Sequence, residues 1–219
     1  MNIRENVDSV RQNIQKLVAD PITINIVAAT KYANPEQMVA LFESGITIMG
    51  ENRVDSLLEK QSQLSLPIEW HFIGTLQSRK VKEVINKIAC LHSLDRLSLA
   101  KEIQKYRQET LPCFIQVNVS GEESKHGLSV EEVIPFLQQL KEYPIIKVIG
   151  LMTMAPHTEE ETIIRECFQS LKQLQVSISQ LHLNGVNCSS LSMGMSNDYL
   201  IAIEEGATHV RLGSILFQD

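Results

Sequence analysis

Hydrophobic and polar positions alternate in two different ways along the 219-residue chain. Short continuous apolar runs are typical of buried strands, whereas apolar residues repeated every three or four positions are typical of amphipathic helices. Ile3, Val7, Val10 and Ile14 follow the helical spacing, so an N-terminal helix is expected to end near Leu17. The apolar runs predict strands at residues 24–29, 46–49, 70–74, 88–92, 113–119, 145–152, 186–191 and 209–212.

Helical spacing returns after each of these runs except the last. Pro35 stands at a favourable helix start, and Gly45 follows the last apolar residue of the same segment. Ser129 and Glu132 have the spacing of a capping box, in which each side chain binds the backbone N–H of the other residue. Further helices are expected around residues 54–58, 81–85, 97–106, 160–181 and 197–205.

Strands that alternate with helices in this number are compatible with two architectures, a (β/α)8 barrel and a doubly wound open sheet. An open sheet that binds a dinucleotide favours a glycine-rich turn after its first strand, but residues 30–35 contain no glycine. The pattern therefore predicts an α/β protein, a (β/α)8 TIM barrel with an additional N-terminal helix. No Gly/Ser linker or composition break divides the chain, so residues 1–219 are expected to form a single domain.

Composition and charge argue against several classes of protein. Hydrophobic residues make up 43% of the chain and charged residues 21%, which is ordinary globular usage. The formal net charge is −6, and no basic stripe is present to neutralise nucleic-acid phosphates. No apolar run approaches the roughly 20 residues of a membrane helix, and the N-terminus lacks the apolar core of a signal peptide. We therefore expect a cytoplasmic protein with neither nucleic acid nor membrane as a partner.

The four cysteines, Cys90, Cys113, Cys167 and Cys188, are far apart and form no C-x-x-C pair. Zinc and redox sites need close spacing somewhere in the sequence, so reduced, buried thiols and no metal site are expected. A monomer is the default expectation for the assembly. The first helix could cover the bottom of the barrel or pair with another chain.

Polar residues gather at the predicted C-terminal ends of the strands, which is where barrels of this kind place their chemistry. Lys31 follows the first predicted strand and is the only lysine at such an end. A lysine in this place is ordinarily just solvated. A partly desolvated lysine, however, loses its proton well below the usual pKa of about 10.4. The neutral amine is a nucleophile that forms Schiff bases with aldehydes.

The ends of the last two predicted strands carry small residues and hydroxyl groups. Residues 192–198 read Ser-Met-Gly-Met-Ser-Asn-Asp, and residues 211–214 read Arg-Leu-Gly-Ser. Small residues let backbone N–H groups approach an anion, and barrels commonly hold phosphate at the loops after strands seven and eight. Two ordinary turns and a surface arginine are the alternative. A lysine nucleophile and a phosphate site on one barrel mouth suit pyridoxal 5′-phosphate (PLP), which carries an aldehyde and a phosphate on opposite sides of its ring.

These segments form part of a longer series of motifs. The chain resembles the pyridoxal phosphate homeostasis proteins, whose fold is similar to the barrel domain of alanine racemases. The resemblance covers nearly the whole chain, and the run from residue 191 to residue 196 is long and specific. Its landmarks are Ala28–Lys31, Gly50–Arg53, Trp70–Gly74, Leu76–Ser78, Gln116–Asn118, Lys125–Gly127, Gly150–Met154, Ser192–Ser196 and Val210–Ser214.

The resemblance implies a cofactor site with PLP as its ligand. Lys31 matches the lysine that holds PLP as a Schiff base. The positions that contact the phosphate are matched by Ser196, Arg211, Gly213 and Ser214.

Three further residues match motifs near the cofactor in the same family. Met195 lines the same site, and Asn52 and His71 fall in motifs close to it. The chain departs from the family pattern in two places. Thr30 stands where serine is commoner before the lysine, and Gln218 stands where glycine is usual, so only the extreme C-terminus is put in doubt.

Two functions compete on this basis, beside a barrel that binds no cofactor. The first is a PLP-binding regulator or carrier that buffers and delivers PLP, with PLP-dependent apo-enzymes as candidate recipients. The second is a PLP-dependent amino-acid racemase or decarboxylase. Racemisation needs acid–base groups on both faces of the cofactor, and racemases of this fold supply one of them from a further C-terminal domain.

That further domain is not expected here, because the chain stops two residues after Phe217. Tyr32, His71 and His157 are the available substitutes for the missing base. The sequence thus favours a carrier without catalytic residues and without efficient turnover.

Overall fold

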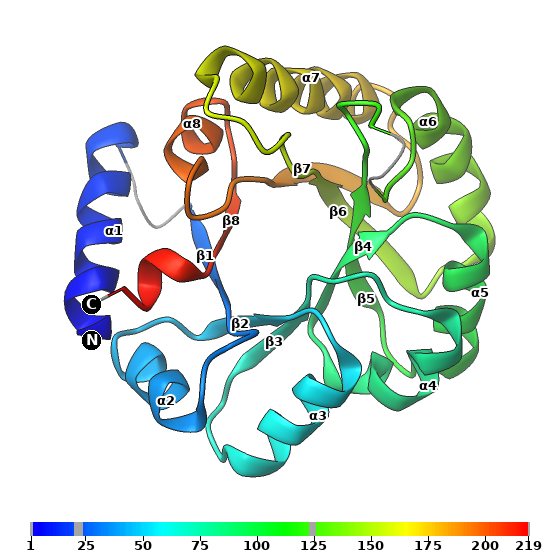
Figure 1. The fold of residues 1–219 in the computed structure, drawn as a ribbon. Coiled ribbons are helices and arrows are strands. Elements are labelled where there is room, and N and C mark those ends of the chain that lie inside the picture. The colour runs from blue at the N-terminus through cyan, green and yellow to red at the C-terminus, as the bar shows by residue number, and fades with distance from the viewer. Residues whose placement is uncertain (1, 20–23, 123–125, 219) are drawn as a thin grey trace.

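The computed structural model of the chain describes residues 2–19, 24–122 and 126–218, so Lys125 of the family motifs lies outside the described residues. Parallel strands close into a barrel in sequence order, and β1 pairs with β8 to complete it (Figure 1). The predicted fold class is confirmed. The strands are β1 (Asn25–Ala29), β2 (Ile48–Glu51), β3 (Glu69–Phe72), β4 (Cys90–Leu94), β5 (Leu111–Gln116), β6 (Ile146–Met152), β7 (Val186–Ser192) and β8 (His209–Leu212).

Helices surround this barrel. Both the Asn34–Gln37 pair before α2 and the Ser129–Glu132 pair before α6 form capping boxes, which confirms the second of them as predicted from its spacing. The α-helices are α1 (Ile3–Leu17), α2 (Pro35–Glu43), α3 (Val54–Gln63), α4 (Val81–Val84), α5 (Leu97–Tyr106), α6 (Val130–Gln139), α7 (Glu161–Ser179) and α8 (Tyr199–Glu204). Short 3-10 turns are η2 (Ser78–Lys80), η3 (Ile85–Lys87), η4 (Leu140–Glu142) and η5 (Ser214–Leu216). No helix in the described part of the chain has the length and apolar character needed to cross a bilayer.

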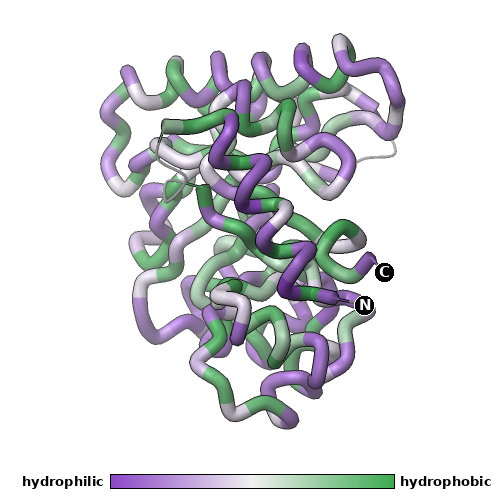
Figure 2. Tube along the Cα trace, turned by 90° about the vertical axis from the view of Figure 1, so that its left-hand side faces the viewer, coloured by the Kyte–Doolittle hydropathy of each residue, from purple (hydrophilic) through white to green (hydrophobic). Residues whose placement is uncertain are grey.

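The N-terminal helix α1 belongs to the outer ring rather than to the bottom of the barrel. It contacts α2, α8 and η5, and it lies between α2 and α8 in Figure 1. Its buried face is apolar, and the side chain of Asn6 donates hydrogen bonds to the carbonyl oxygens of Leu216 and Gln218. Both chain ends therefore lie side by side at this helix (Figure 2). Helix α1 takes the position that a helix after β8 would otherwise occupy.

Strand β2 begins two residues later than the apolar run predicts. Ile46 donates its backbone N–H to the carbonyl oxygen of Leu41, and Gly45 adopts a φ of 81°. This arrangement is the glycine-based end of a helix, in which the first residues after the helix satisfy its last carbonyl groups. Ile46 is therefore used to finish α2, and only then does the chain enter the sheet.

The barrel interior is unusually polar for this fold. Barrels of this kind are normally filled by layers of bulky, branched apolar side chains. Here His71, His92, Ser192 and Arg211 lie among the inward residues, and each of them is 5% exposed or less. Buried polar groups are stable only when hydrogen bonds satisfy them, so these side chains must find partners within the barrel.

Candidate functional site

A cavity of about 790 Å³ opens where β1, β7 and β8 end. This is the C-terminal face of the barrel, where the chemistry of such folds is located. Five of the predicted site residues line this one cavity, and Ala29 at the end of β1 lines it as well. The five residues are Met195, Ser196, Arg211, Gly213 and Ser214.

The loop after β7 is held in a tight shape that depends on Gly194. Its φ of 91° favours glycine, and a Cβ atom at this position would lie 2.6 Å from the Cβ of Ala202. The carbonyl oxygen of Gly194 accepts the backbone N–H of Arg211, while Met195 donates its own N–H to Asp198 Oδ1 at 2.5 Å. Burial raises the pKa of the Asp198 carboxyl. The loop and β8 are thereby fixed against each other.

The hydroxyl of Ser196 marks a place where backbone donors converge. Its Oγ accepts the N–H groups of Gly213 at 3.1 Å and Ile215 at 3.3 Å. Successive backbone N–H groups that point at one spot form a concavity suited to an anion. An anionic oxygen that took the place of Ser196 Oγ would meet these two donors, so the residues around Ser196 fit the phosphate of a cofactor.

Arg211 carries the positive charge of the cavity. Its Nη1 donates to Ser192 Oγ at 2.7 Å, and its Nη2 donates to the carbonyl oxygen of Thr153 at 2.8 Å. Burial lowers the pKa of Arg211 to about 10, which still leaves the guanidinium charged at neutral pH. Both partners are neutral and an arginine has five N–H donors, so charge and donors remain for an anionic ligand.

Lys31 lies in the turn that follows β1, two residues beyond Ala29. Its side chain is exposed, and the Nζ atom lies 4.6 Å from the ring centroid of Tyr32, which is itself exposed. The structure therefore places Lys31 two residues after Ala29, which lines the cavity, but does not include Lys31 in the lining.

Asn52 and His71 lie away from this cavity. Asn52 lines a separate cavity of about 380 Å³ together with Phe72 and Lys80, and its buried Oδ1 has no hydrogen-bond partner among the described residues. An orphaned buried oxygen fits a donor from a ligand, since native structures satisfy most buried polar atoms. His71 lies inside the barrel, where its ring nitrogens contact His92 and Glu69.

A buried ion pair beneath the Lys31 turn was missed by the sequence analysis. Lys60 Nζ lies 2.6 Å from Glu51 Oε1 and 2.5 Å from the carbonyl oxygen of Thr30. The hydroxyl of Thr30 donates to the same carboxylate oxygen at 2.6 Å, and Ser56 donates to the other oxygen. A signal was present in the sequence, because Lys60 continues the three-residue spacing of Val54 and Leu57 on the buried face of α3.

His92, Cys90 and His71 present possible ligand atoms within 4.8 Å of one another. Both nitrogens of each histidine, however, already take part in hydrogen bonds: to each other, to Ser192 and to Glu69. Burial raises the pKa of the Cys90 thiol well above its ordinary value, which disfavours the thiolate form that binds metals. We therefore interpret His71, His92 and Cys90 as a hydrogen-bonded cluster rather than as a metal centre.

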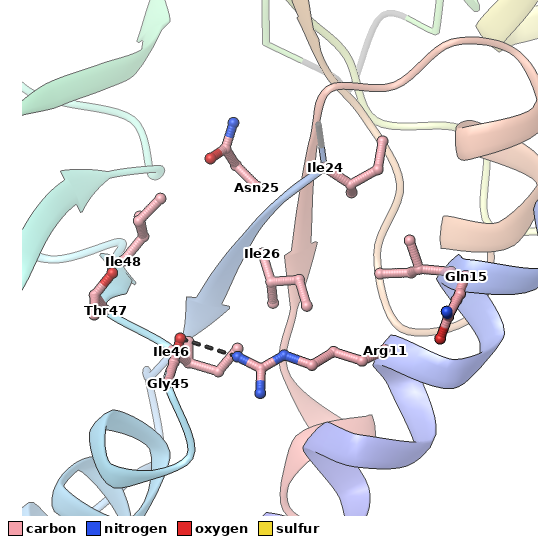
Figure 3. A pocket seen from close by; sticks show the side chains of 10 residues that line it. Arg11, Gln15, Ile24, Asn25, Ile26, Gly45, Ile46, Thr47 and Ile48 are labelled. Atoms are coloured by element: carbon pink, nitrogen blue, oxygen red, sulfur yellow. Dashed lines mark hydrogen bonds between the residues drawn. The ribbon is translucent and has the colours of Figure 1, made fainter. Parts of the chain in front are cut away.

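A different cavity, of about 520 Å³, lies at the opposite end of the strands. Figure 3 shows it between α1 and the beginnings of β1 and β2, with Ile24, Ile26 and Ile48 on its walls. Arg11 reaches across it to the carbonyl oxygens of Ser44 and Gly45, so its guanidinium fastens α1 to the end of α2. The position at the strand starts is the stabilising rather than the chemical face of such barrels.

The fold and this site define a barrel of the alanine racemase N-terminal domain class, whose family model matches residues 2–219. The pyridoxal phosphate homeostasis protein of Aquifex aeolicus (strain VF5) is 39% identical, and the alignment covers 100% of this chain and 99% of that protein. The protein of the same description from Pseudomonas aeruginosa is 34% identical over 99% of this chain and 93% of its own length. The chain belongs to the pyridoxal phosphate homeostasis protein family, which confirms the resemblance.

Solved structures agree with this assignment. PipY of Synechococcus elongatus with PLP bound has a TM-score of 0.88 at 25% identity, covering 99% of this chain and 100% of that one. The same protein without PLP has a TM-score of 0.90 at 27% identity, with the same coverage. The alanine racemase of Corynebacterium glutamicum has a TM-score of 0.78 at 15% identity. This chain covers 99% of its own length but 60% of the racemase, so that likeness concerns the barrel fold alone.

Proposed function

We propose that this chain binds PLP in the cavity at the ends of β1, β7 and β8, and that it serves PLP homeostasis by buffering and delivering the cofactor. One observation carries the proposal: four residues that follow β7 and β8, Met195, Ser196, Gly213 and Ser214, line a single cavity together with the charged, buried guanidinium of Arg211 on β8. The PLP-bound structure of PipY, which shares the fold over 99% of this chain, supports the choice of ligand.

The phosphate end of the ligand is assigned to the donors around Ser196 and Arg211. Charge-assisted hydrogen bonds to a phosphate are about twice as strong as neutral ones. The N–H groups of Gly213 and Ile215 both donate to Ser196 Oγ, and they would add to the binding if a phosphate oxygen took its place. Ser214 and Met195 complete the wall around this end of the cavity.

The aldehyde end is assigned to Lys31, whose neutral Nζ would condense with the aldehyde carbon to form a Schiff base, the carbonyl oxygen leaving as water. When bound, PLP supplies a reactive aldehyde and an electron-withdrawing ring. The exposed side chain of Lys31 has to leave the ring of Tyr32 to enter the cavity. Lys60 and Glu51 hold the carbonyl and hydroxyl of Thr30, so the backbone from which Lys31 extends is fixed.

The arrangement of possible bases supports a carrier rather than an efficient enzyme. Fast racemisation requires positioned acid–base groups on both faces of the bound amino acid. Both nitrogens of His71 are engaged inside the barrel, and Tyr32 is 87% exposed. His157 lines the cavity but is exposed. An open site of this kind suits reversible loading and release of PLP, since a reaction usually needs a site closed against water.

Two measurements on the purified chain test this proposal together. An equilibrium titration should show saturable PLP binding that Lys31→Ala removes and that the exposed control Lys101→Ala leaves unchanged. The PLP-loaded protein is then incubated with a panel of L-amino acids, and chirality, carbon dioxide and keto acids are followed. Absence of binding would contradict the cofactor assignment. A turnover of about 1 s⁻¹ or more, the lower range of ordinary enzymes, would replace the carrier with an enzyme.

The compartment, the assembly state and the recipients of PLP complete the account of a carrier. We infer a cytoplasmic monomer that passes PLP to apo-enzymes, and the buried thiols of Cys90, Cys113 and Cys188 are compatible with a reducing compartment. Sedimentation equilibrium tests the assembly state, and a dimer mass at micromolar concentration would contradict it. Transfer is tested by mixing the loaded chain with a PLP-dependent apo-enzyme and following the recovery of its activity. Recovery no faster than with an equal concentration of free PLP would contradict delivery.

A further inference from the structure

A continuous line of hydrogen bonds crosses the barrel interior from the cavity to the first residue of β3. Arg211 Nη1 lies 2.7 Å from Ser192 Oγ, which lies 2.8 Å from His92 Nδ1. His92 Nε2 lies 2.9 Å from His71 Nδ1, and His71 Nε2 lies 3.0 Å from Glu69 Oε1. Because β4 and β7 are not neighbours in the sheet, the bond between His92 and Ser192 must pass through the interior.

When both histidine rings are neutral, the two ends of this line fix the direction of every hydrogen bond between them. Arg211 can only donate, and the ionised carboxylate of Glu69 can only accept. The hydrogen bond from His71 holds the pKa of Glu69 below its ordinary value, which keeps that carboxylate ionised. Burial lowers the pKa of His92 well below its ordinary value, so His92 is neutral and has one donor and one acceptor.

From these constraints the protons can be placed one at a time. His71 donates from Nε2 to Glu69, which leaves its Nδ1 as the acceptor when the ring is neutral. His92 then donates from Nε2 to His71 and accepts at Nδ1 from the hydroxyl of Ser192. Ser192 in turn accepts from Arg211. Each hydrogen thus points away from the guanidinium and toward the carboxylate.

The groups packed around this line do not offer it other strong partners. Cys90 on β4 and Cys113 on β5 are buried thiols whose pKa values are raised by burial, so they stay neutral. His209 on β8 is neutral at ordinary pH because burial lowers its pKa to about 4. Asp198, in the loop after β7, is the carboxyl that lies toward Arg211 at the other end. Thr153, the residue directly after β6, contributes its carbonyl oxygen to Arg211.

We propose that Ser192, His92, His71 and Glu69 act as one set of positioning residues that holds the guanidinium of Arg211 toward the PLP cavity. The proposal rests on the proposed function, because it concerns the same cavity. It accounts for polar side chains where this fold normally has apolar ones, since a half-satisfied polar network is worse than an apolar core. It also gives His71 a role at the site without contact with the ligand.

The first test uses the wild-type chain and needs no ligand. Long-range ¹H–¹⁵N spectra of histidine side chains distinguish the two neutral tautomers and the charged form. Near neutral pH, both His71 and His92 are expected to carry their single ring proton on Nε2. A proton on Nδ1 of His92, or a doubly protonated His71, would overturn the directed line of hydrogen bonds.

The second test compares two substitutions of the central histidine. In His92→Gln the amide can accept from Ser192 and donate to His71, as the neutral imidazole does, whereas His92→Leu fills the space without polar atoms. The dissociation constant for PLP should rise about tenfold in His92→Leu, since a charge-assisted contact is misplaced. In His92→Gln it should stay within about threefold of wild type. The exposed His182→Asn is the matched control.

The outcomes separate this proposal from the proposed function. If both His92 variants bind PLP as wild type does, or if His92→Gln is as weak as His92→Leu, the positioning role is wrong while the cofactor assignment stands. If the wild-type chain binds no PLP, the proposed function fails and the positioning role toward PLP fails with it. The tautomer spectra then decide the direction of the hydrogen bonds by themselves, and they remain decisive should a variant fail to fold.

Discussion

Lys60 Nζ and Glu51 Oε1 lie 2.6 Å apart in a pair that is almost wholly shielded from water. The pair joins α3 to β2, and Lys60 also binds the carbonyl oxygen of Thr30 at 2.5 Å. Because Thr30 directly precedes Lys31, the ion pair fixes the backbone from which the proposed cofactor lysine extends. The buried ion pair of Lys60 and Glu51 thus stabilises the backbone next to the proposed site and is not part of the cavity lining.

Breaking this pair from one side should be strongly destabilising. Lys60→Met leaves the fully buried carboxylate of Glu51 without a cation, and removing one partner of a buried pair costs about 3–5 kcal/mol. Urea denaturation should report this loss in the free energy of unfolding. The double variant Lys60→Met/Glu51→Gln should recover much of it, and the exposed Lys82→Met should be neutral. A Lys60→Met protein as stable as wild type would contradict the account of this ion pair.

The loop after β7 should depend on Gly194 for steric reasons as well as for its backbone conformation. Gly194 and Gly185 both have a positive φ, 91° and 78°. An added Cβ meets Ala202 at 2.6 Å in the first case and nothing within 4 Å in the second. Gly194→Ala should therefore lower the free energy of unfolding by about 1–3 kcal/mol more than Gly185→Ala does, which is the usual cost of overpacking. Equal losses in thermal and urea denaturation would show that the contact with Ala202 is relieved freely.

Replacing Arg211 should weaken the binding of PLP strongly, although Arg211 is one of many residues that line the cavity. Arg211→Gln removes a charge-assisted contact worth about 1.5–3 kcal/mol, so PLP retention should weaken at least about tenfold. Near- and far-ultraviolet circular dichroism should show that the fold is kept. Arg4→Gln, at an exposed position of α1, is the charge-matched control. An unchanged dissociation constant in an equilibrium titration would remove Arg211 from the ligand site.

Acid should destabilise the fold through the histidines of the barrel interior. Burial lowers the pKa of His209 from 6.5 to about 4 and that of His92 well below its ordinary value. Between pH 6.5 and about 4, the unfolded chain binds more protons at His209 than the folded chain does. The free energy of unfolding therefore falls as the pH falls through this interval. Each such group contributes up to about 1.4 kcal/mol per pH unit.

Urea denaturation at a series of pH values measures this dependence. His209→Gln should reduce the slope of stability against pH between 6.5 and about 4, the interval over which the two states of this histidine differ. His182→Asn, at an exposed position, should leave the slope as it is in wild type. A slope that His209→Gln does not change would contradict the assignment of a neutral, buried His209.

Much of the fold could be predicted because local patterns and the barrel agree. Short apolar runs mark strands that are covered on both faces, and the Ser129–Glu132 spacing marks the start of α6. The boundaries of β2 were harder to predict, because Ile46 looks like a strand residue but binds Leu41 to finish α2. The place of α1 between α2 and α8 depends on packing between distant segments, which periodicity does not reveal.

The residues in and around the site also include some whose placement could be predicted and some whose roles could not. That Ser196 and Arg211 lie close together could be predicted, because parallel strands bring their C-terminal ends to one face, and both residues line one cavity. The roles of Lys60 and His92 could not be predicted, because their hydrogen-bond partners are distant in the sequence. Lys60 binds Thr30, and His92 binds Ser192. Each of them is a polar residue at a position where the pattern of the helix or strand is otherwise apolar.

Covalent attachment of PLP to Lys31 is the central claim, and mass spectrometry tests it directly. The chain is saturated with PLP, reduced with borohydride to make the attachment permanent, digested, and its peptides are sequenced by tandem mass spectrometry. The account predicts a phosphopyridoxyl group on Lys31 in wild type and in the exposed control Lys101→Ala, and none in Lys31→Ala. A label on another lysine, or no label on the saturated wild-type chain, would contradict it.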